Sequence, residues 1–169
     1  MRPTVKAVSA AFLACVCATA MWAQAAKPGP LSTPELKQVV PSVYYFRGQS
    51  ATVQVRNSSG FRASNGKLVL VALVDTSGYA QNVAEKYQGM LITEIKLNLG
   101  GTELAPGAYG FGFVGDNKFI VMDVGANDLM TATTTLDEQL QHPVPLKLQQ
   151  DGNGYRFYSG RKWVAMRPE

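Results

Sequence analysis

Short runs of hydrophobic residues follow one another along most of the chain, with polar turn residues between them. Runs that are rich in β-branched and aromatic residues and bounded by Gly, Asn, Asp or Pro are typical of strands. We expect strands within residues 42–48, 51–57, 61–64, 67–75, 91–99, 108–114, 119–125, 143–150, 155–158 and 163–166. The hydrophobic pattern therefore predicts an all-β protein.

Two of these runs differ in the spacing of their hydrophobic residues. Residues 67–75 (KLVLVALVD) are apolar on both faces of a strand, which predicts a central strand that is buried on both sides. Residues 91–99 (LITEIKLNL) alternate instead, with Glu94, Lys96 and Asn98 on one face. A period of two predicts a single half-exposed strand.

Turn residues suggest how neighbouring strands are joined. Asn65-Gly66 predicts a two-residue hairpin of type I′, because both residues tolerate the positive φ that this turn requires. The turns at 151–154 and 159–162 predict a three-stranded meander in the last third of the chain.

Three segments have helical signals. Thr33 as N-cap and Pro34 at the first helical position favour a short helix that ends before Pro41, and residues 80–87 fit a helix or a loop equally well. Residues 135–142 are predicted to be helical, because Thr135 and Glu138 fit a capping box.

The expected fold is a single-domain antiparallel β-sandwich, immunoglobulin- or prealbumin-like, with about 8–10 strands and one or two short helices. A small closed β-barrel is the alternative.

The N-terminus predicts export. Residues 1–25 combine Arg2 and Lys6 with an apolar run and the cleavage signal Ala23-Gln24-Ala25, which together indicate a secretory signal peptide. A membrane anchor and a lipoprotein box at Cys15 are the alternatives. We expect residues 26–33 to form a flexible arm, residues 34–169 to form the domain, and the protein to be secreted or periplasmic.

Cleavage also changes the composition. Removing residues 1–25 from the 169 leaves 144 residues and takes away both cysteines, Cys15 and Cys17, so we expect no disulfide and no cysteine metal site. Without Arg2 and Lys6 the 16 basic residues become 14 against 12 acidic ones, and the net charge falls from +4 to +2. A nearly balanced charge without a basic cluster speaks against nucleic acid as a partner, and we expect no cofactor.

Residues 110–115 match the dinucleotide-binding pattern G-x-G-x-x-G. That pattern needs a helix directly after the glycines to hold a pyrophosphate, and here a second strand follows, so we expect no nucleotide. Gly110 and Gly112 instead lie within a strand, where glycine indicates that something approaches closely. Either a large side chain such as Trp163 or Tyr45 covers them, or they line a shallow ligand groove.

Residues suited to catalysis or metal binding are few. Asp75 begins a turn, Asp123 at the end of a strand is expected to bond to backbone amides or to pair with Arg, and His142 is expected in a surface loop. Neither an acid pair nor a Ser-His-Asp set is evident. A calcium site formed by Asp116, Asn117, Asp151 and Asn153 lacks the EF-hand spacing. We assign no catalytic residue and no metal ligand.

The strand at 155–158 supplies a binding candidate. Tyr155 and Phe157 share one face, and Arg156 and Tyr158 share the other. If the first face is core, Arg156 and Tyr158 are exposed, and an aromatic ring beside an arginine can stack on a sugar or hold a peptide. The predicted ligand-binding residues are Arg156, Tyr158, Gly110 and Gly112.

The segment LNLGGTELAPGAYGFGFVG resembles the strand entry of prealbumin-like, carboxypeptidase-regulatory β-sandwich modules, through Leu104, Pro106, Gly107 and Tyr109. The resemblance covers about 20 residues and implies a noncatalytic sandwich. We therefore expect a noncatalytic binding or interaction module of the cell envelope or extracellular space, with an unknown glycan or protein partner. The alternatives are a small secreted hydrolase and a structural component of the envelope.

Overall fold

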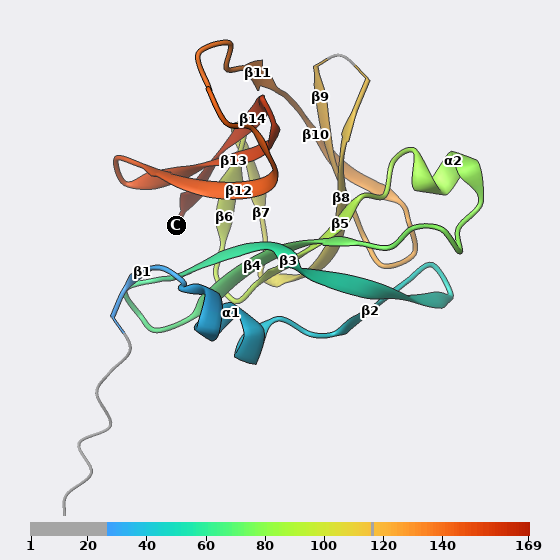
Figure 1. Cartoon of the computed structure of the whole chain (residues 1–169), viewed down its shortest axis with the longest axis horizontal. Helices are drawn as coiled ribbons and strands as arrows, with labels where there is room; N and C mark the ends of the chain where they lie inside the picture. Colours follow the sequence, from blue (N-terminus) through green and yellow to red (C-terminus); the bar gives the residue numbers. More distant parts are fainter. Residues whose placement is uncertain (1–26, 116) are drawn as a thin grey trace, which may run out of the picture.

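The computed structural model describes residues 27–115 and 117–169 as a sandwich of two antiparallel sheets (Figure 1). The predicted signal peptide and Asp116 lie outside the described residues. The first sheet contains β1 (Gly29–Pro30), β2 (Val43–Phe46), β3 (Gln49–Arg62), β4 (Leu68–Val74), β5 (Gly89–Thr93), β8 (Gly107–Val114), β9 (Lys118–Met122) and β10 (Asp128–Thr133). The second sheet contains β6 (Leu97–Leu99), β7 (Thr102–Leu104), β11 (Thr135–Leu136), β12 (Val144–Asp151), β13 (Gly154–Gly160) and β14 (Lys162–Pro168).

The sheet orders confirm the predicted sandwich over the barrel. The first sheet runs β1-β3-β4-β5-β8-β9-β10, with β2 on β3, and the second runs β12-β13-β14-β6-β7, with β11 on β14. Neither sheet closes on itself. Within the described residues there are fourteen strands, more than expected, because several have only two to four residues. The predicted meander is confirmed as β12, β13 and β14.

The main hydrophobic core lies between the two sheets. Phe111 and Phe113 of β8 and Phe119 of β9 extend from the first sheet and meet Phe157 of β13. The ring centroids of Phe111 and Phe157 are 5.0 Å apart in an edge-to-face arrangement, the geometry that aromatic pairs prefer. Along β8 these aromatic residues alternate with Gly110 and Gly112, so the ridge and the glycines lie on opposite faces of the strand.

The other face of the first sheet is covered as well. Helix α1 (Thr33–Val39), helix α2 (Gln81–Ala84) and the β2–β3 hairpin form this layer, with Phe46 and Tyr87 completely buried in it. Because cores lie on both sides, β4 is apolar at successive positions, as predicted: Val69 and Val71 enter the first core, and Leu70 and Ala72 enter the second.

The prediction of one strand over residues 91–99 is wrong. The segment divides into β5 of the first sheet and β6 of the second, and the chain crosses between the sheets at residues 94–96. Buried Thr93 stabilises the crossing, since its hydroxyl donates to the carbonyl of Ile95 at 2.6 Å. The alternation survives because both strands turn the same set of side chains into the core between the sheets: Leu91, Thr93, Ile95, Leu97 and Leu99 are all buried.

Two local predictions also need correction. Residues 135–142 form no helix: β11 pairs Thr135 with Trp163, and a turn follows at Asp137. Long-range pairing outweighs the local capping signal here. In the β3–β4 hairpin only Gly66 has positive φ (82°), so the turn is not type I′, and the side chain of Asn65 accepts a hydrogen bond from the Lys67 N–H.

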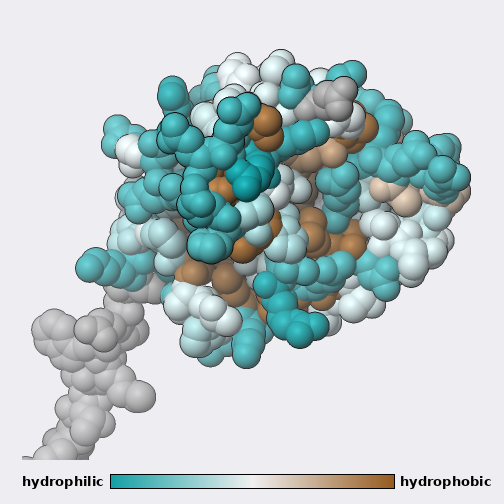
Figure 2. All heavy atoms as spheres, turned by 45° about the horizontal axis from the view of Figure 1, so that its top comes forward, coloured by the Kyte–Doolittle hydropathy of each residue, from teal (hydrophilic) through white to brown (hydrophobic). Residues whose placement is uncertain are grey.

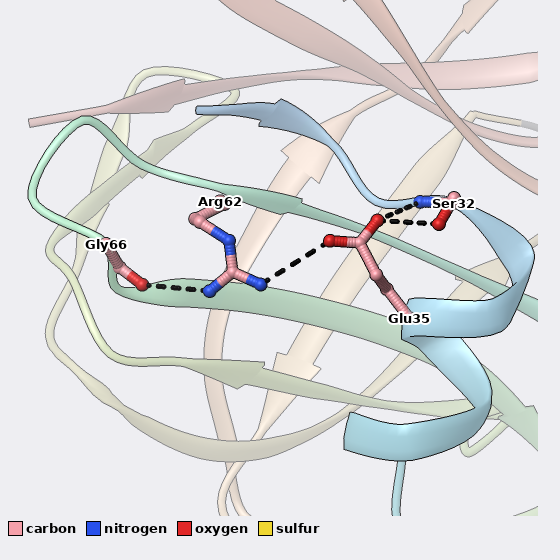
Figure 3. Close-up of polar contacts among 4 residues, drawn as sticks. All are labelled: Ser32, Glu35, Arg62 and Gly66. Carbon is pink, nitrogen blue, oxygen red and sulfur yellow. Dashed lines mark hydrogen bonds and ion pairs between the residues drawn. The ribbon is translucent and has the colours of Figure 1, made fainter. Parts of the chain in front are cut away.

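Helix α1 is bound to the end of β3 by a polar cluster (Figure 3). The helix lies where it was predicted, but Ser32 rather than Thr33 is its N-cap. The Glu35 carboxylate accepts from the Ser32 N–H at 2.9 Å and from the Ser32 hydroxyl at 2.6 Å. Arg62 lies 3.7 Å from Glu35 and donates to the Gly66 carbonyl at 3.3 Å. Residues 29–31 of the predicted arm are likewise bonded to β3.

The Pro106-Gly107 entry into β8 is held by a tyrosine corner. The Tyr109 hydroxyl donates to the carbonyl of Ala105 at 2.9 Å, four residues upstream. Such a bond fixes a chain that passes from one sheet of a sandwich to the other. It gives a physical reason for the L-x-P-G-x-Y pattern.

The surface is largely hydrophilic in the view of Figure 2, with hydrophobic side chains visible between the polar regions. Large hydrophobic residues that are exposed within the described part of the chain are Val43, Tyr45, Val124, Leu129, Leu136 and Val144. Neither helix of residues 27–115 and 117–169 is long and apolar enough to cross a membrane.

Candidate functional site

The outer face of the second sheet carries two of the predicted site residues. On β13, Tyr155 and Phe157 enter the core, so Arg156 and Tyr158 point away from it. Tyr158 is not exposed, however: only 1% of its surface is accessible. The segment that follows β11 covers it, and its hydroxyl donates to the Asp137 carboxylate at 2.9 Å. Burial raises the pKa of the Tyr158 phenol, which therefore stays protonated and donates.

Arg156 is held in place from two sides. Its Nε donates to the Asp151 carboxylate at 2.8 Å, and its guanidinium carbon lies 4.6 Å from the centroid of the Trp163 ring. The side chain keeps 36% of its surface accessible. A guanidinium fixed over an indole in this way is a cation–π pair, worth about 0.5–1 kcal/mol at an exposed site.

Trp163 lies next to Tyr158 because of the register of the last hairpin. Ser159 pairs with Lys162 across the turn, and Tyr158 therefore pairs with Trp163. On its other side Trp163 pairs with Thr135 of β11. The half-buried indole is thus part of a regular sheet rather than a loop.

An open depression of about 360 Å³ surrounds this indole. Its floor and walls come from β13, β14, β11 and the turn after β11, and it is lined by Thr135, Leu136, Asp137, Glu138, Gln139, Arg156 and Trp163. The turn is fastened to the β13–β14 hairpin, because the Asp137 N–H donates to the Arg161 carbonyl at 2.8 Å and Arg161 donates to the Glu138 carbonyl at 2.9 Å. We refer to this site as the Trp163 depression.

The lining combines one aromatic ring with acid, amide and guanidinium groups. Such a site can pack against the apolar face of a ligand and form hydrogen bonds around its edge. Asp137 already accepts hydrogen bonds from Tyr158 and, at 3.2 Å, from the Gln139 N–H. The Asp137 carboxylate is therefore held in a fixed orientation at the edge of the depression.

Gly110 and Gly112 lie elsewhere, buried on the second face of the first sheet. A Cβ on Gly110 would overlap the ring of Phe46, and a Cβ on Gly112 would overlap the carbonyl oxygen of Lys86. The predicted close approach is confirmed, but the predicted covering residues, Trp163 and Tyr45, are wrong. A ligand could reach either glycine only after Phe46 or the chain at Lys86 moved away.

Asp123 has the backbone partners that the sequence favoured. Its carboxylate accepts from the Gly125 and Asn127 N–H groups at 2.9 Å each, and from the Asn127 side chain. Hydrogen bonds from Asn127, first from its side chain and then from its backbone, together with the Gly125 N–H, lower the pKa of Asp123. The carboxylate therefore closes the β9–β10 turn.

Other candidates for chemistry are dispersed. His142 is exposed between β11 and β12 and does not line the Trp163 depression. Asp151 pairs with Arg156, and Asp75 accepts from the Ser77 N–H as a turn residue. In the described part of the chain, no three His, Cys, Asp or Glu residues are grouped as they would be to hold a metal ion.

Sequence reasoning missed the roles of Trp163 and Asp137. The hairpin register could have revealed Trp163, because a tight turn at Gly160-Arg161 places Tyr158 opposite it. Nothing local could have revealed Asp137, which reaches Tyr158 from 21 residues away.

Comparisons with known proteins found no counterpart: no family model, no curated protein and no solved structure matches the chain. The resemblance of residues 97–115 to prealbumin-like modules has no family match behind it. Function must therefore be argued from the site itself.

Proposed function

We propose that the chain is an exported, noncatalytic binding module that holds a saccharide in the Trp163 depression. The observation that supports this most is the stacked pair of Arg156 and Trp163 inside a hollow with a polar rim. The proposal includes cleavage of residues 1–25 as a signal peptide, which would bring the domain to the cell envelope or the extracellular space.

The chemistry of the lining favours a saccharide. A pyranose ring has an apolar C–H face that packs on an indole, and hydroxyl groups around its edge that need donors and acceptors. The part of the Trp163 indole that Arg156 leaves uncovered supplies the platform, Asp137 and Glu138 supply carboxylates, and Gln139 and Arg156 supply donors. A depression of about 360 Å³ lies within the range of roughly 300–1,000 Å³ that small-molecule sites occupy.

Rigidity of the site also supports binding. Arg156 is held by Asp151, Trp163 is paired on both sides within the sheet, and the turn after β11 is fastened at Arg161. Side chains that are already ordered lose less entropy when a ligand arrives. A weakly hydrated arginine that stacks on an aromatic ring is also suited to hydrogen bonding at a partly dry surface.

Calorimetric titration with a panel of mono- and oligosaccharides tests the proposal. We expect Trp163→Ala to weaken binding by about tenfold or more, since removing a central aromatic contact costs more than about 1 kcal/mol. Tyr45→Ala is the matched control, because Tyr45 is an exposed aromatic residue (57%) on β2 of the other sheet. Equal loss in the two variants, or binding that Trp163→Ala leaves unchanged, would contradict the proposal. Binding of peptides instead of saccharides, with the same dependence on Trp163, would assign the site to a protein partner.

A further inference from the structure

Three distant parts of the chain meet at a second, smaller pocket in the layer of α2 and the β2–β3 hairpin. The pocket has a volume of about 240 Å³ and is lined by Arg47, Asn82, Val83, Lys86, Met122 and Ala126. Arg47 belongs to the β2–β3 turn, Asn82 and Lys86 to α2 and the residues after it, and Ala126 to the β9–β10 turn. The Arg47 N–H donates to the Val124 carbonyl at 2.7 Å and so joins the two turns.

Two residues that line this pocket have a backbone conformation that is unfavourable for residues other than glycine and asparagine. Arg47 (φ 47°) and Ala126 (φ 69°) are the only residues other than glycine with positive φ among those described, and both line the pocket. Asn or Gly adopts this conformation at lower cost, and the two-residue hairpin turn Arg47-Gly48 is a position where Asn is favoured. Strained backbone of this kind is often retained where a site needs it.

The charged side chains described around this pocket differ in whether they are paired. The Lys86 ammonium lies 2.9 Å from the Asp128 carboxylate, and the Asp123 carboxylate accepts hydrogen bonds from N–H groups of its own turn. The Arg47 guanidinium, by contrast, has no hydrogen bond and no ion pair to any of the described residues. An arginine uses its planar fork to bind carboxylates in a bidentate way.

The rest of the lining is mostly apolar. Val83 and Met122 are buried, at 7% and 1% accessible surface, and Ala126 adds a methyl group. Asn82 is exposed at the rim and provides an amide. The pocket is smaller than the roughly 300 Å³ that begins the usual range for drug-sized ligands, so it suits a small molecule with one charged and one apolar end.

We propose that this pocket binds a small organic carboxylate, with the charged end on Arg47 and Asn82 and the apolar end on Val83 and Met122. The site is independent of the saccharide site, which lies on the outer face of the other sheet. Binding also gives a reason for arginine at a position where asparagine would fit the turn better.

Ligand-observed NMR and calorimetry with four probes test this inference: benzoate, acetate, inorganic phosphate and benzamide. We expect benzoate to bind with a Kd of about 0.1–10 mM, because small ligands gain little affinity from so few contacts. Acetate and phosphate have no ring to place on Val83 and Met122, and benzamide has no charge for Arg47. Each should therefore bind at least about tenfold more weakly than benzoate.

The informative variant is Arg47→Asn, which removes the guanidinium but suits the turn. It should weaken benzoate binding at least about tenfold and leave the melting temperature unchanged or raise it by about 1–3 °C. Arg56→Asn is the control, because Arg56 lines a different cavity, beside α1. The inference is overturned if no probe binds at about 10 mM, if benzamide binds as well as benzoate, or if Arg47→Asn keeps the affinity of the wild type.

Discussion

Gly112 of β8 is a position where one added methyl group should be severely damaging. The Cβ of an alanine there would overlap the carbonyl oxygen of Lys86. That oxygen belongs to the backbone, so no side-chain rotation can relieve the clash. The chain at residues 86–88 would have to move away from β8.

The size of the effect follows from what holds this segment on β8. The Gln88 N–H donates to the Phe111 carbonyl at 2.8 Å, and the Gln88 side chain donates to the Phe113 carbonyl at 3.0 Å and accepts from the Phe113 N–H at 2.9 Å. Each bond contributes about 0.5–1.5 kcal/mol, and overpacking itself costs about 1–3 kcal/mol. If some of these bonds break, the free energy of unfolding falls by about 3–5 kcal/mol, out of roughly 5–15 kcal/mol for a typical domain.

Urea denaturation of Gly112→Ala beside Gly78→Ala measures this difference. Gly78 has ordinary backbone geometry, and the nearest atom to an added Cβ is the Gln49 side chain at 3.9 Å, so its substitution should be neutral or slightly stabilising. Gly112→Ala should lower the melting temperature by about 10 °C, at roughly 3 °C per kcal/mol for a chain of this length. If Gly112→Ala lowers the free energy of unfolding by less than about 1 kcal/mol, the reasoning that close packing requires glycine at this position is refuted.

Three other substitutions probe the second core and the β9–β10 turn. The Tyr87 hydroxyl is buried without a hydrogen-bond partner among the described residues, so Tyr87→Phe should raise the free energy of unfolding by about 1 kcal/mol. The Tyr79 hydroxyl donates to the Phe46 carbonyl at 3.0 Å, so Tyr79→Phe should lower the free energy of unfolding. The opposite changes in the two variants would contradict this account. Asp123 has a lowered pKa, because Asn127 and Gly125 donate to its carboxylate, so its contribution to stability is present above the ordinary pKa of 3.8 and lost as pH falls through the lower folded value. The stability difference between wild type and Asp123→Ala should therefore narrow as the pH falls below that ordinary value, and a constant difference would contradict the assigned role.

The parts of the fold that were predictable are those encoded by local patterns. The apolar run of residues 67–75 predicted the buried strand β4, and the turn residues at 151–154 and 159–162 predicted the last meander. Alternation alone says less, because side chains alternate in every strand whatever sheet it joins. For the same reason the alternation of residues 91–99 could not show that the strand breaks in two. Both halves turn the same side chains inward, and the break depends on Thr93 and on which partner strands are available.

The site was less predictable, because distant contacts create it. Residues 135–142 have a helix-capping pattern, but pairing of Thr135 with Trp163 and the bond from Tyr158 to Asp137 hold them as a strand and turn over β13. That cover buries Tyr158 and leaves Arg156 with Trp163 as the accessible pair. The glycine pattern at 110–115 was likewise ambiguous until Phe46 and Lys86 were placed against it.

The fluorescence of Trp163 tests the central claim most directly. The sequence contains two tryptophans, Trp22 and Trp163, so a chain that begins after residue 25 reports only on the proposed saccharide site. Titration with a saccharide that binds should change the emission of Trp163 in a saturable way, with the same Kd that calorimetry gives. Arg156→Ala should raise that Kd. Saccharide binding that leaves the Trp163 emission unchanged would contradict the account, because the sugar would then lie away from the indole.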